Sequence, residues 1–308
     1  MEDQSSNPLL CDIETGMCQM PDAPQEIQEN KIKAGPKPVR VIYFTDPICS
    51  SCWGIEPQLR KLKLEYGNSF EMEYRMGGLL PDWGYNSGGI SKPSDVAHHW
   101  DEVSHHYDMP IDGDVWLEDP LHSSYPPSIA FKAAALQDKS KAAAFLRAIR
   151  EMVFLRKKNI ARWEHLVRAA QQVGLNVKQF QLDYEGKAKE LFNEDLALAR
   201  ELGVRGFPTL FFVDSLGKQE RVYGTKPYGV YETALLKLQP DANKTSYDAS
   251  WNNLFAKYPT LTSREFAELV GIGRNDSDKH LEQIHKEGHL QKTETKNGML
   301  WMRKNSSR

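Results

Sequence analysis

The chain has 308 residues, of which 40% are hydrophobic, and a formal net charge of −3 at neutral pH. This length and apolar content suit two globular domains, and the small negative charge gives no reason to expect a nucleic acid as partner. Because the sequence starts with Met-Glu-Asp-Gln and has no apolar run of about 18 residues, we expect a cytoplasmic protein without membrane contact.

Two of the four cysteines lie near the amino-terminal end. Cys11 and Cys18 enclose six residues that include Gly16, which permits a tight reversal, so a disulfide between them is sterically plausible. Three roles stay open for the pair: an accessory dithiol that exchanges electrons with the other cysteines, a metal clip, or incidental thiols. Since residues 1–38 are rich in Asp, Glu, Gln, Asn and Pro, we expect them to form a flexible segment.

The other two cysteines lie where a strand is predicted to turn into a helix. The run Val39–Phe44 is β-branched and aromatic, and apolar residues recur at helical spacing from Ile55 to Tyr66. A cysteine at a helix start faces unpaired N–H groups and the positive end of the helix dipole, which lower the pKa of its thiol. We therefore predict Cys49 as the nucleophile and Cys52, one turn later, as the resolving thiol.

A metal site is the alternative for these cysteines. Half of a zinc site would need a second pair of ligands, and the sequence contains no second C-x2-C. His98, His99, His105 and His106 share a helix-like segment with acidic residues, but a polar helix face exposed to water needs no metal. We therefore predict neither a metal nor a cofactor.

Three residues next to the dithiol are weighed separately. Trp53 is a candidate substrate contact, although a tryptophan there most often only packs. Pro57 should kink the helix because it removes a backbone hydrogen bond. For Glu56 a solvated carboxylate is favoured over a buried proton relay, since acidic side chains are seldom buried unpaired.

Most of the sequence between the dithiol and residue 206 has helical periodicity. Four stretches are Ala-rich or place apolar residues at i, i+3 and i+4: Ser128–Leu136, Lys141–Leu155, Trp163–Val173 and Lys187–Leu202. Gly174 and Gly203 follow the last two as stop signals. These stretches predict a helical domain, at about residues 92–190, inserted into an α/β unit.

After these helices, Gly206-Phe207-Pro208-Thr209 leads directly into the apolar strand predicted at 210–214. With the earlier C-x2-C and the helices between them, this segment resembles the DsbA family of thioredoxin-like proteins. The resemblance implies an α/β thioredoxin fold over residues 39–238 with an inserted helical domain. It also implies a cis peptide bond before Pro208, next to the dithiol, and a substrate strand that pairs with the backbone of Gly206 and Phe207.

Two groups within that family match different parts of the chain. The residues Asp46-Pro47-Ile48-Cys49, Cys52-Trp53, Glu56-Pro57 and Gly298-Met299-Leu300-Trp301 resemble the SpxH/YjbH group. Members of that group deliver the Spx transcription regulator to the ClpXP protease. The first 238 residues are equally similar to FrnE-type oxidoreductases.

A small second unit is predicted at residues 248–308, after a linker at 239–247. Three helices followed by a hairpin with its turn at 296–298 resemble a winged helix. This unit has ten Lys or Arg and eight Asp or Glu, a net charge of +2, whereas the recognition-helix segment 276–288 has a net charge of −2. Because a helix in the DNA groove must approach phosphates, we expect a role in protein interaction or packing instead.

Two functions of different class follow. The first is a cytoplasmic thiol-disulfide oxidoreductase that uses Cys49 and Cys52 on protein substrates. This hypothesis is slightly favoured, because an adapter would not by itself need two cysteines. The second is an SpxH-like adapter that carries a Spx-like regulator to ClpXP, with the dithiol as a redox sensor or relic. The related kappa transferases fit less well because they usually replace the dithiol with a serine.

Overall fold

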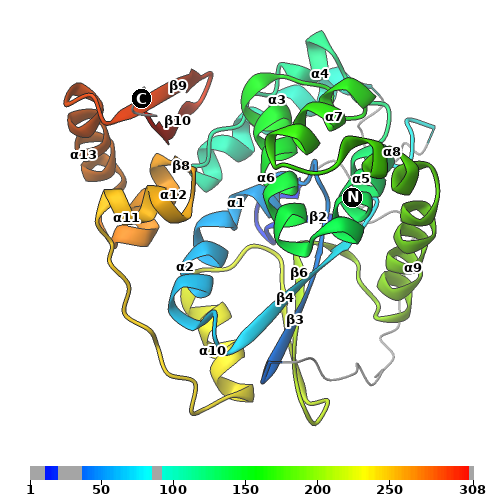
Figure 1. Ribbon diagram of the computed structural model, residues 1–308, viewed down its shortest axis with the longest axis horizontal. Coiled ribbons are helices and arrows are strands. Elements are labelled where there is room, and N and C mark those ends of the chain that lie inside the picture. Colours follow the sequence, from blue (N-terminus) through cyan, green and yellow to red (C-terminus); the bar gives the residue numbers. More distant parts are fainter. Residues whose placement is uncertain (1–10, 20–36, 85–91, 305–308) are drawn as a thin grey trace, which may run out of the picture.

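A four-stranded mixed sheet forms the centre of the molecule, in the order β4-β3-β6-β7 (Figure 1). The computed structural model describes residues 11–19, 37–84 and 92–304. Strand β3 pairs in parallel with β4 and antiparallel with β6, which pairs antiparallel with β7. These strands span Val39–Thr45 for β3, Phe70–Met76 for β4, Thr209–Asp214 for β6 and Gln219–Tyr223 for β7.

Burial explains which strands the sequence pattern revealed. Strand β3 lies between two neighbours and is buried except at Arg40, so its sequence is an almost continuous apolar run. Strand β4 lies at the edge of the sheet, and five of its seven residues are only partly buried. Its polar sequence therefore gave no strand signal, and neither did that of the other edge strand, β7.

The helix predicted after the dithiol is divided in two. Helix α1 spans Ser50–Gly54 and α2 spans Glu56–Tyr66, with Ile55 capping both. We predicted that Pro57 would kink a continuous helix. Instead it lies in the first turn of α2, where its missing N–H removes no hydrogen bond.

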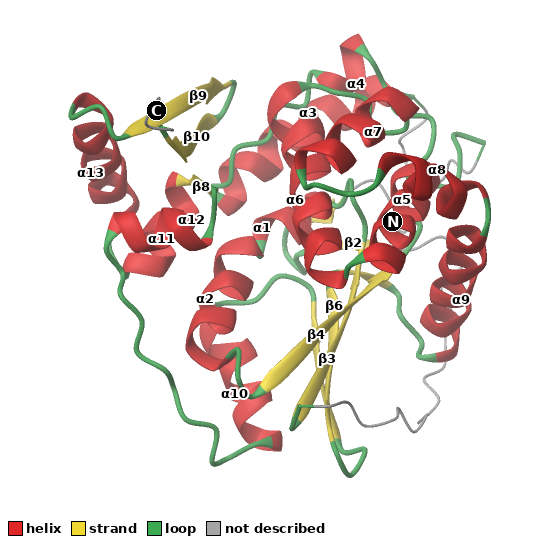
Figure 2. Cartoon of the chain, viewed as in Figure 1, coloured by secondary structure: helices red, strands yellow, loops and turns green. Residues whose placement is uncertain are grey.

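The inserted helical domain lies between β4 and the return of the chain to the sheet, as predicted (Figure 2). Its helices are α3 (Pro93–Tyr107), α4 (Val115–Glu118), α5 (Tyr125–Gln137), α6 (Lys139–Arg156), α7 (Trp163–Gln172), α8 (Val177–Glu185) and α9 (Lys187–Glu201). Helix α8 was not predicted because Phe180 is its one buried residue, which leaves no apolar period. None of the described helices is long and apolar enough to cross a membrane.

Part of the amino-terminal segment that we predicted to be flexible forms a hairpin. Strand β1 (Cys11–Asp12) pairs antiparallel with β2 (Met17–Gln19), and β2 pairs antiparallel with β5 (Gly206–Phe207). Residues 1–10 and 20–36 lie outside the described residues. Composition misled the prediction because the hairpin is stabilised by a partner strand almost 190 residues away rather than by its own apolar content.

The carboxy-terminal unit follows α10 (Tyr228–Leu238) and an extended connection on the left of Figure 1. It contains α11 (Trp251–Lys257), β8 (Thr260–Thr262), α12 (Ser263–Val270), α13 (Arg274–Lys286), β9 (Leu290–Thr295) and β10 (Gly298–Arg303). The strands form a sheet in the order β8-β10-β9 beside an apolar core that includes Phe266 and Trp301. Three helices and a hairpin were predicted, and β8 is an addition.

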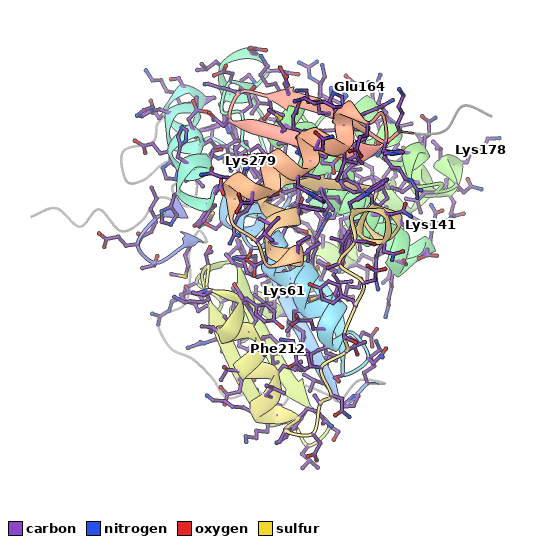
Figure 3. All side chains as sticks on the ribbon, turned by 90° about the vertical axis from the view of Figure 1, so that its left-hand side faces the viewer. Lys61, Lys141, Glu164, Lys178, Phe212 and Lys279 are labelled. Atoms are coloured by element: carbon purple, nitrogen blue, oxygen red, sulfur yellow. The ribbon has the colours of Figure 1, made fainter. Side chains whose placement is uncertain are left out.

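Buried charges attach this unit to the rest of the chain. Glu265 of α12 is fully buried, and its two oxygens accept hydrogen bonds of 2.7 and 3.0 Å from Arg147 of α6. Arg60 of α2 lies 3.2 Å from the same carboxylate. Burial alone would raise the pKa of Glu265, but the two arginine charges outweigh it and lower the pKa. Lys61, labelled in Figure 3, pairs with Glu268 of α12 at 3.6 Å at the same junction.

Candidate functional site

The dithiol lies at the start of α1, where strand β3 has ended. Cys49 is the N-cap of this helix, and its Sγ accepts a hydrogen bond from the backbone N–H of Cys52 at 3.2 Å. A sulfur in this position replaces the usual oxygen cap and satisfies one of the unpaired N–H groups of the first turn. The spacing of the two cysteines thus puts both thiols on one turn, with Cys49 at its start.

Both cysteines are free thiols and both are completely buried. Burial raises the pKa of Cys49 well above its ordinary value, and its hydrogen bond with the Cys52 thiol adds to this effect. Burial acts in the same direction on Cys52, but the hydrogen bond from Cys49 and the charge of Arg150 lower its pKa. We expected a lowered pKa at Cys49. In this closed arrangement, loss of solvent outweighs the helix terminus.

A buried arginine accompanies the dithiol. Arg150 of α6 donates hydrogen bonds to Thr45 Oγ1 at 2.6 Å, to the carbonyl oxygen of Asp46 at 3.2 Å and to Glu56 Oε1 at 2.7 Å. Its charge favours the thiolate form of both cysteines. The sequence analysis did not identify it, although an arginine in the middle of a mostly apolar helix face was an available signal.

Glu56 therefore forms an ion pair instead of being fully solvated. Its carboxylate is partly buried and lies 2.7 Å from Arg150 and 3.8 Å from Arg60. The solvated carboxylate that we favoured is thus replaced by a charge pair that a distant helix provides. Because a buried arginine needs a counter-charge, Glu56 supports the position of Arg150 beside the thiols.

Asp46 organises the turn before the dithiol. Its Oδ1 accepts the N–H of Ile48 at 3.0 Å, and its Oδ2 accepts the N–H of Leu79 at 2.8 Å and the hydroxyl of Ser124 at 2.9 Å. Burial raises the pKa of this carboxyl to about 6, against the opposing effect of these hydrogen bonds. The Asp46 carbonyl also accepts the N–H of Cys49 at 3.2 Å, so the turn holds the dithiol helix in place.

The Phe207–Pro208 peptide bond, which is cis, follows the short strand β5. The Phe207 ring occupies the space above Gly77, where a Cβ would lie 1.7 Å from the ring. Strand β5 pairs with β2 in a register that sets Cys18 opposite Phe207 and Gln19 opposite Gly206. The backbone that the resemblance assigned to a substrate strand is thus paired with the chain's own hairpin.

The hairpin also brings a third cysteine to the dithiol. Cys18 is disulfide-bonded and fully buried, and its Sγ lies 3.3 Å from Cys49 Sγ. The backbone register sets Cys11 opposite Cys18 in the hairpin. The predicted accessory pair and the predicted catalytic pair are therefore neighbours in space.

Two further residues that the sequence analysis missed connect the hairpin to the dithiol helix. Thr225 donates from its N–H and its hydroxyl to the carbonyl oxygen of Gly16, at 2.9 and 3.0 Å. The same hydroxyl lies 3.3 Å from Tyr107 Oη, which lies 2.9 Å from Ser51 Oγ. No local pattern marks these residues, because they meet only through contacts between distant segments.

Trp53, the remaining predicted site residue, lies in the core. Its ring is fully buried and stacks on Phe154 with centroids 5.5 Å apart. Its Nε1 donates to the carbonyl oxygen of Pro110 at 3.1 Å. The guanidinium of Arg147 lies 4.3 Å from the ring centroid, so Trp53 links the dithiol helix to the arginine that holds the carboxy-terminal unit.

The histidines that we assigned to a solvated face have mixed surroundings. His98 is largely exposed and lies 3.2 Å from Glu102, whereas His99 is buried. Among residues 11–19, 37–84 and 92–304, no group of three or more His, Cys, Asp or Glu side chains is arranged to hold a metal ion.

This chain matches a family model over most of its length and is also similar in sequence to individual proteins. The thioredoxin family model matches residues 43–233. The chain is 34% identical over 301 residues to the ClpXP adapter protein SpxH of Halalkalibacterium halodurans, a match that covers 96% of this chain and 97% of the relative. It is 30% identical over 270 residues to SpxH of Bacillus subtilis, covering 86% and 89%.

Two solved structures with a similar fold are named as disulfide enzymes. A putative protein disulfide isomerase from Nitrosomonas europaea has a TM-score of 0.55 and 21% identity, covering 66% of this chain and 97% of its own. The cytosolic disulfide reductase DsbM from Pseudomonas aeruginosa has a TM-score of 0.53 and 22% identity, covering 65% and 99%. At this identity the likeness establishes the fold alone.

Proposed function

This chain belongs to the thioredoxin family and to the SpxH group within it, and we propose that it is an adapter that brings a client protein to a ClpXP-type protease. The client we propose is a regulator of the Spx type, and the proposed location is the cytoplasm. One observation carries the proposal. The match to an SpxH relative covers 96% of the chain, whereas the two similar disulfide enzymes cover only 66% and 65% of it.

The closed dithiol also favours an adapter. An oxidoreductase must present its nucleophilic sulfur to a disulfide in another protein, because exchange proceeds by direct attack of one sulfur on another. Here both Cys49 and Cys52 have no exposed surface, and burial raises the pKa of the Cys49 thiol. Recruitment of a client through the protein surface requires neither an exposed thiol nor a thiolate.

The carboxy-terminal unit is a further argument for recruitment. It has a core of its own, and buried ion pairs between Glu265 and two arginines hold it against α2 and α6. A second folded unit held in one orientation extends the surface that two partners can contact at the same time. Thiol-disulfide exchange at Cys49 has no need of such a unit.

Degradation of a purified Spx-type regulator by ClpXP, with and without the chain, tests the proposal. We expect small amounts of the chain to accelerate degradation, and the double variant Cys49→Ser/Cys52→Ser to accelerate it equally. DsbM, which shares the fold, serves as the control protein and should leave the rate unchanged. If DsbM accelerates degradation as well as this chain, or if neither does, the adapter proposal is wrong.

Oxidoreductase activity is the second candidate, and two observations favour it: the dithiol is free, and the peptide bond before Pro208 is cis. A trapping experiment in the native host separates the two. The Cys52→Ser variant cannot resolve a mixed disulfide at Cys49, so a working enzyme should accumulate protein adducts that dithiothreitol releases. The matched control is Cys49→Ser/Cys52→Ser, which should give no adducts. Equal recovery of one non-covalent client by both variants would favour the adapter.

A further inference from the structure

The amino-terminal hairpin occupies the strand edge next to the dithiol in the way that an extended peptide would. An open strand edge presents unpaired N–H and C=O groups, which bind a peptide by adding a strand. Strand β2 pairs antiparallel with β5 immediately before cis-Pro208. Two hydrogen bonds from Thr225 to Gly16 anchor the turn of the same hairpin.

The register of this pairing directs a cysteine at the dithiol. Cys18 lies opposite Phe207, and its Sγ lies 3.3 Å from Cys49 Sγ. A disulfide bond is about 2.05 Å long, so these sulfurs are in non-bonded contact. Reacting atoms that are held about 3–3.5 Å apart meet the distance condition for attack. Since Cys18 is disulfide-bonded and Cys49 is free, the contact joins a disulfide to a thiol.

We propose that the hairpin disulfide is the internal redox partner of the Cys49–Cys52 dithiol, with Cys18 as the sulfur that Cys49 attacks. We take Cys11, opposite Cys18 in the hairpin register, as the other half of this disulfide. Residues directly opposite in an antiparallel pair have Cα atoms about 4.5–5.5 Å apart, a separation that a disulfide can bridge. The inference goes beyond the adapter function and needs no client.

The exchange proceeds in two steps. The Cys49 thiolate attacks Cys18 Sγ, so that a Cys49–Cys18 bond forms and the Cys11–Cys18 bond breaks, with Cys11 leaving as a thiolate. The Cys52 thiolate then attacks Cys49 Sγ, a Cys49–Cys52 bond forms, and Cys18 leaves. The two thiol protons pass to Cys11 and Cys18. Two electrons move from the dithiol to the hairpin disulfide, and one disulfide is present before and after.

The surroundings of the dithiol fit this exchange. Neither Cys18 nor Cys49 has exposed surface, so thiols from solution cannot compete for them while the hairpin is docked. Burial raises the pKa of Cys49, and the charge of Arg150 opposes that rise; the same charge helps to lower the pKa of Cys52, the resolving thiol. The hairpin disulfide would thus be reduced whenever the dithiol is oxidised, and this exchange needs no exposed sulfur.

The test uses the full chain with single cysteine replacements. In Cys52→Ser the exchange stops at the mixed disulfide, so mass spectrometry of acid-quenched, alkylated and digested protein should detect a Cys18–Cys49 linkage. The matched control is Cys49→Ser. It removes the sulfur that contacts Cys18 and keeps Cys52 as the remaining thiol of the pair. We expect the Cys18–Cys49 linkage in Cys52→Ser to be at least tenfold more abundant than any Cys18–Cys52 linkage in Cys49→Ser. Because the exchange is intramolecular, the rate at which the Cys18–Cys49 linkage forms should not depend on protein concentration.

Two outcomes would overturn the proposal: an intact hairpin disulfide in Cys52→Ser throughout the time course, or equal linkage in both variants. Circular dichroism checks that both variants fold, and Cys52→Ala replaces Cys52→Ser if the serine variant does not. Client degradation is a separate assay, so either proposal can fail alone.

Discussion

The amino-terminal hairpin and the carboxy-terminal unit both attach close to the dithiol helix, but different forces hold them. The hairpin is held by backbone hydrogen bonds from β2 to β5 and from Thr225 to Gly16. The carboxy-terminal unit is held by the buried carboxylate of Glu265 and its two arginine partners, Arg147 and Arg60.

The difference indicates which attachment can be exchanged. Backbone hydrogen bonds contribute only about 0.5–1.5 kcal/mol each, and any extended peptide can form them. A client strand could therefore replace the hairpin. A buried ion pair, in contrast, costs about 3–5 kcal/mol to break when one partner is removed, because a charge is left without its partner. We expect the carboxy-terminal unit to stay docked while the hairpin opens.

The largest expected effect is at Glu265. Glu265→Gln keeps the shape of the side chain but removes a buried counter-charge from two arginines. Arg147 keeps Glu151 and Arg60 keeps Glu56, so the free energy of unfolding should fall by about 3 kcal/mol, the lower end of the range for a broken buried pair. Urea denaturation measures this value. The matched control is Glu190→Gln, which breaks an exposed pair with Lys187 and should cause no measurable change. Equal stability of the two variants would mean that the junction does not depend on charge.

The next effect is a pH dependence at Asp46, in the turn before the dithiol. Burial raises its pKa to about 6 in the folded protein, from an ordinary value of 3.8. Between these values the folded state keeps a proton that the unfolded state has lost, so the contribution of Asp46 to stability falls as pH rises. The pKa of Asp46 differs by roughly two units between the folded and the unfolded state, which corresponds to about 3 kcal/mol in the free energy of unfolding over the full titration.

Replacement of this carboxyl isolates its titration. Relative to Asp46→Asn, which does not titrate, the wild-type free energy of unfolding should fall by about 2 kcal/mol from pH 4 to pH 6.5, most of the full change. Urea denaturation at a series of pH values provides the comparison. Asp276→Asn, at an exposed acidic residue, should run parallel to the wild type. If the free energy of unfolding of Asp46→Asn has the same pH dependence as that of the wild type, the pKa of Asp46 is not raised by folding.

Opening of the hairpin is the third prediction. A Cβ at Gly16 would lie 2.7 Å from Thr225 Cβ, so Gly16→Ala should weaken docking. A weakening of about 1.4 kcal/mol corresponds to a tenfold change in an equilibrium. We therefore expect Cys49 to react with iodoacetamide about tenfold faster, with a pH profile shifted to lower pH because the thiol regains solvent.

A matched glycine controls for backbone strain. Gly16 and Gly217 have φ values of 69° and 83°, but a Cβ at Gly217 would have no atom within 4 Å. Gly217→Ala should therefore leave the reactivity of Cys49 unchanged. Equal acceleration by both alanine variants would point to general destabilisation instead of hairpin release.

The smallest effect is a coupling between the dithiol helix and the carboxy-terminal unit. Arg147 contacts the Trp53 ring and also binds Glu265. A double-mutant cycle of Trp53→Phe and Glu265→Gln should give a coupling energy of about 0.5–1 kcal/mol, measured by urea denaturation. Trp53→Phe combined with Glu190→Gln should be additive. Additive behaviour in the first cycle would mean that Arg147 does not connect the two regions.

Local patterns in the sequence were enough for much of the fold. The apolar run of β3, the C-x2-C before a helix, and helices α5, α6, α7 and α9 were all predicted within a few residues. Each of these depends on periodicity, capping or propensity within one short segment. The edge strands β4 and β7 were missed because partly exposed strands carry no such pattern.

The sequence by itself determined the helix and strand pattern of the core and the place of Cys49 and Cys52 at a helix start. Tertiary structure decided the state of that dithiol. Cys18 contacts Cys49 from 31 positions away, and Arg150 reaches Thr45 across 105 positions. Burial, pKa and sulfur contact depend on atoms that meet only when the chain has folded. No short-range pattern therefore encodes them.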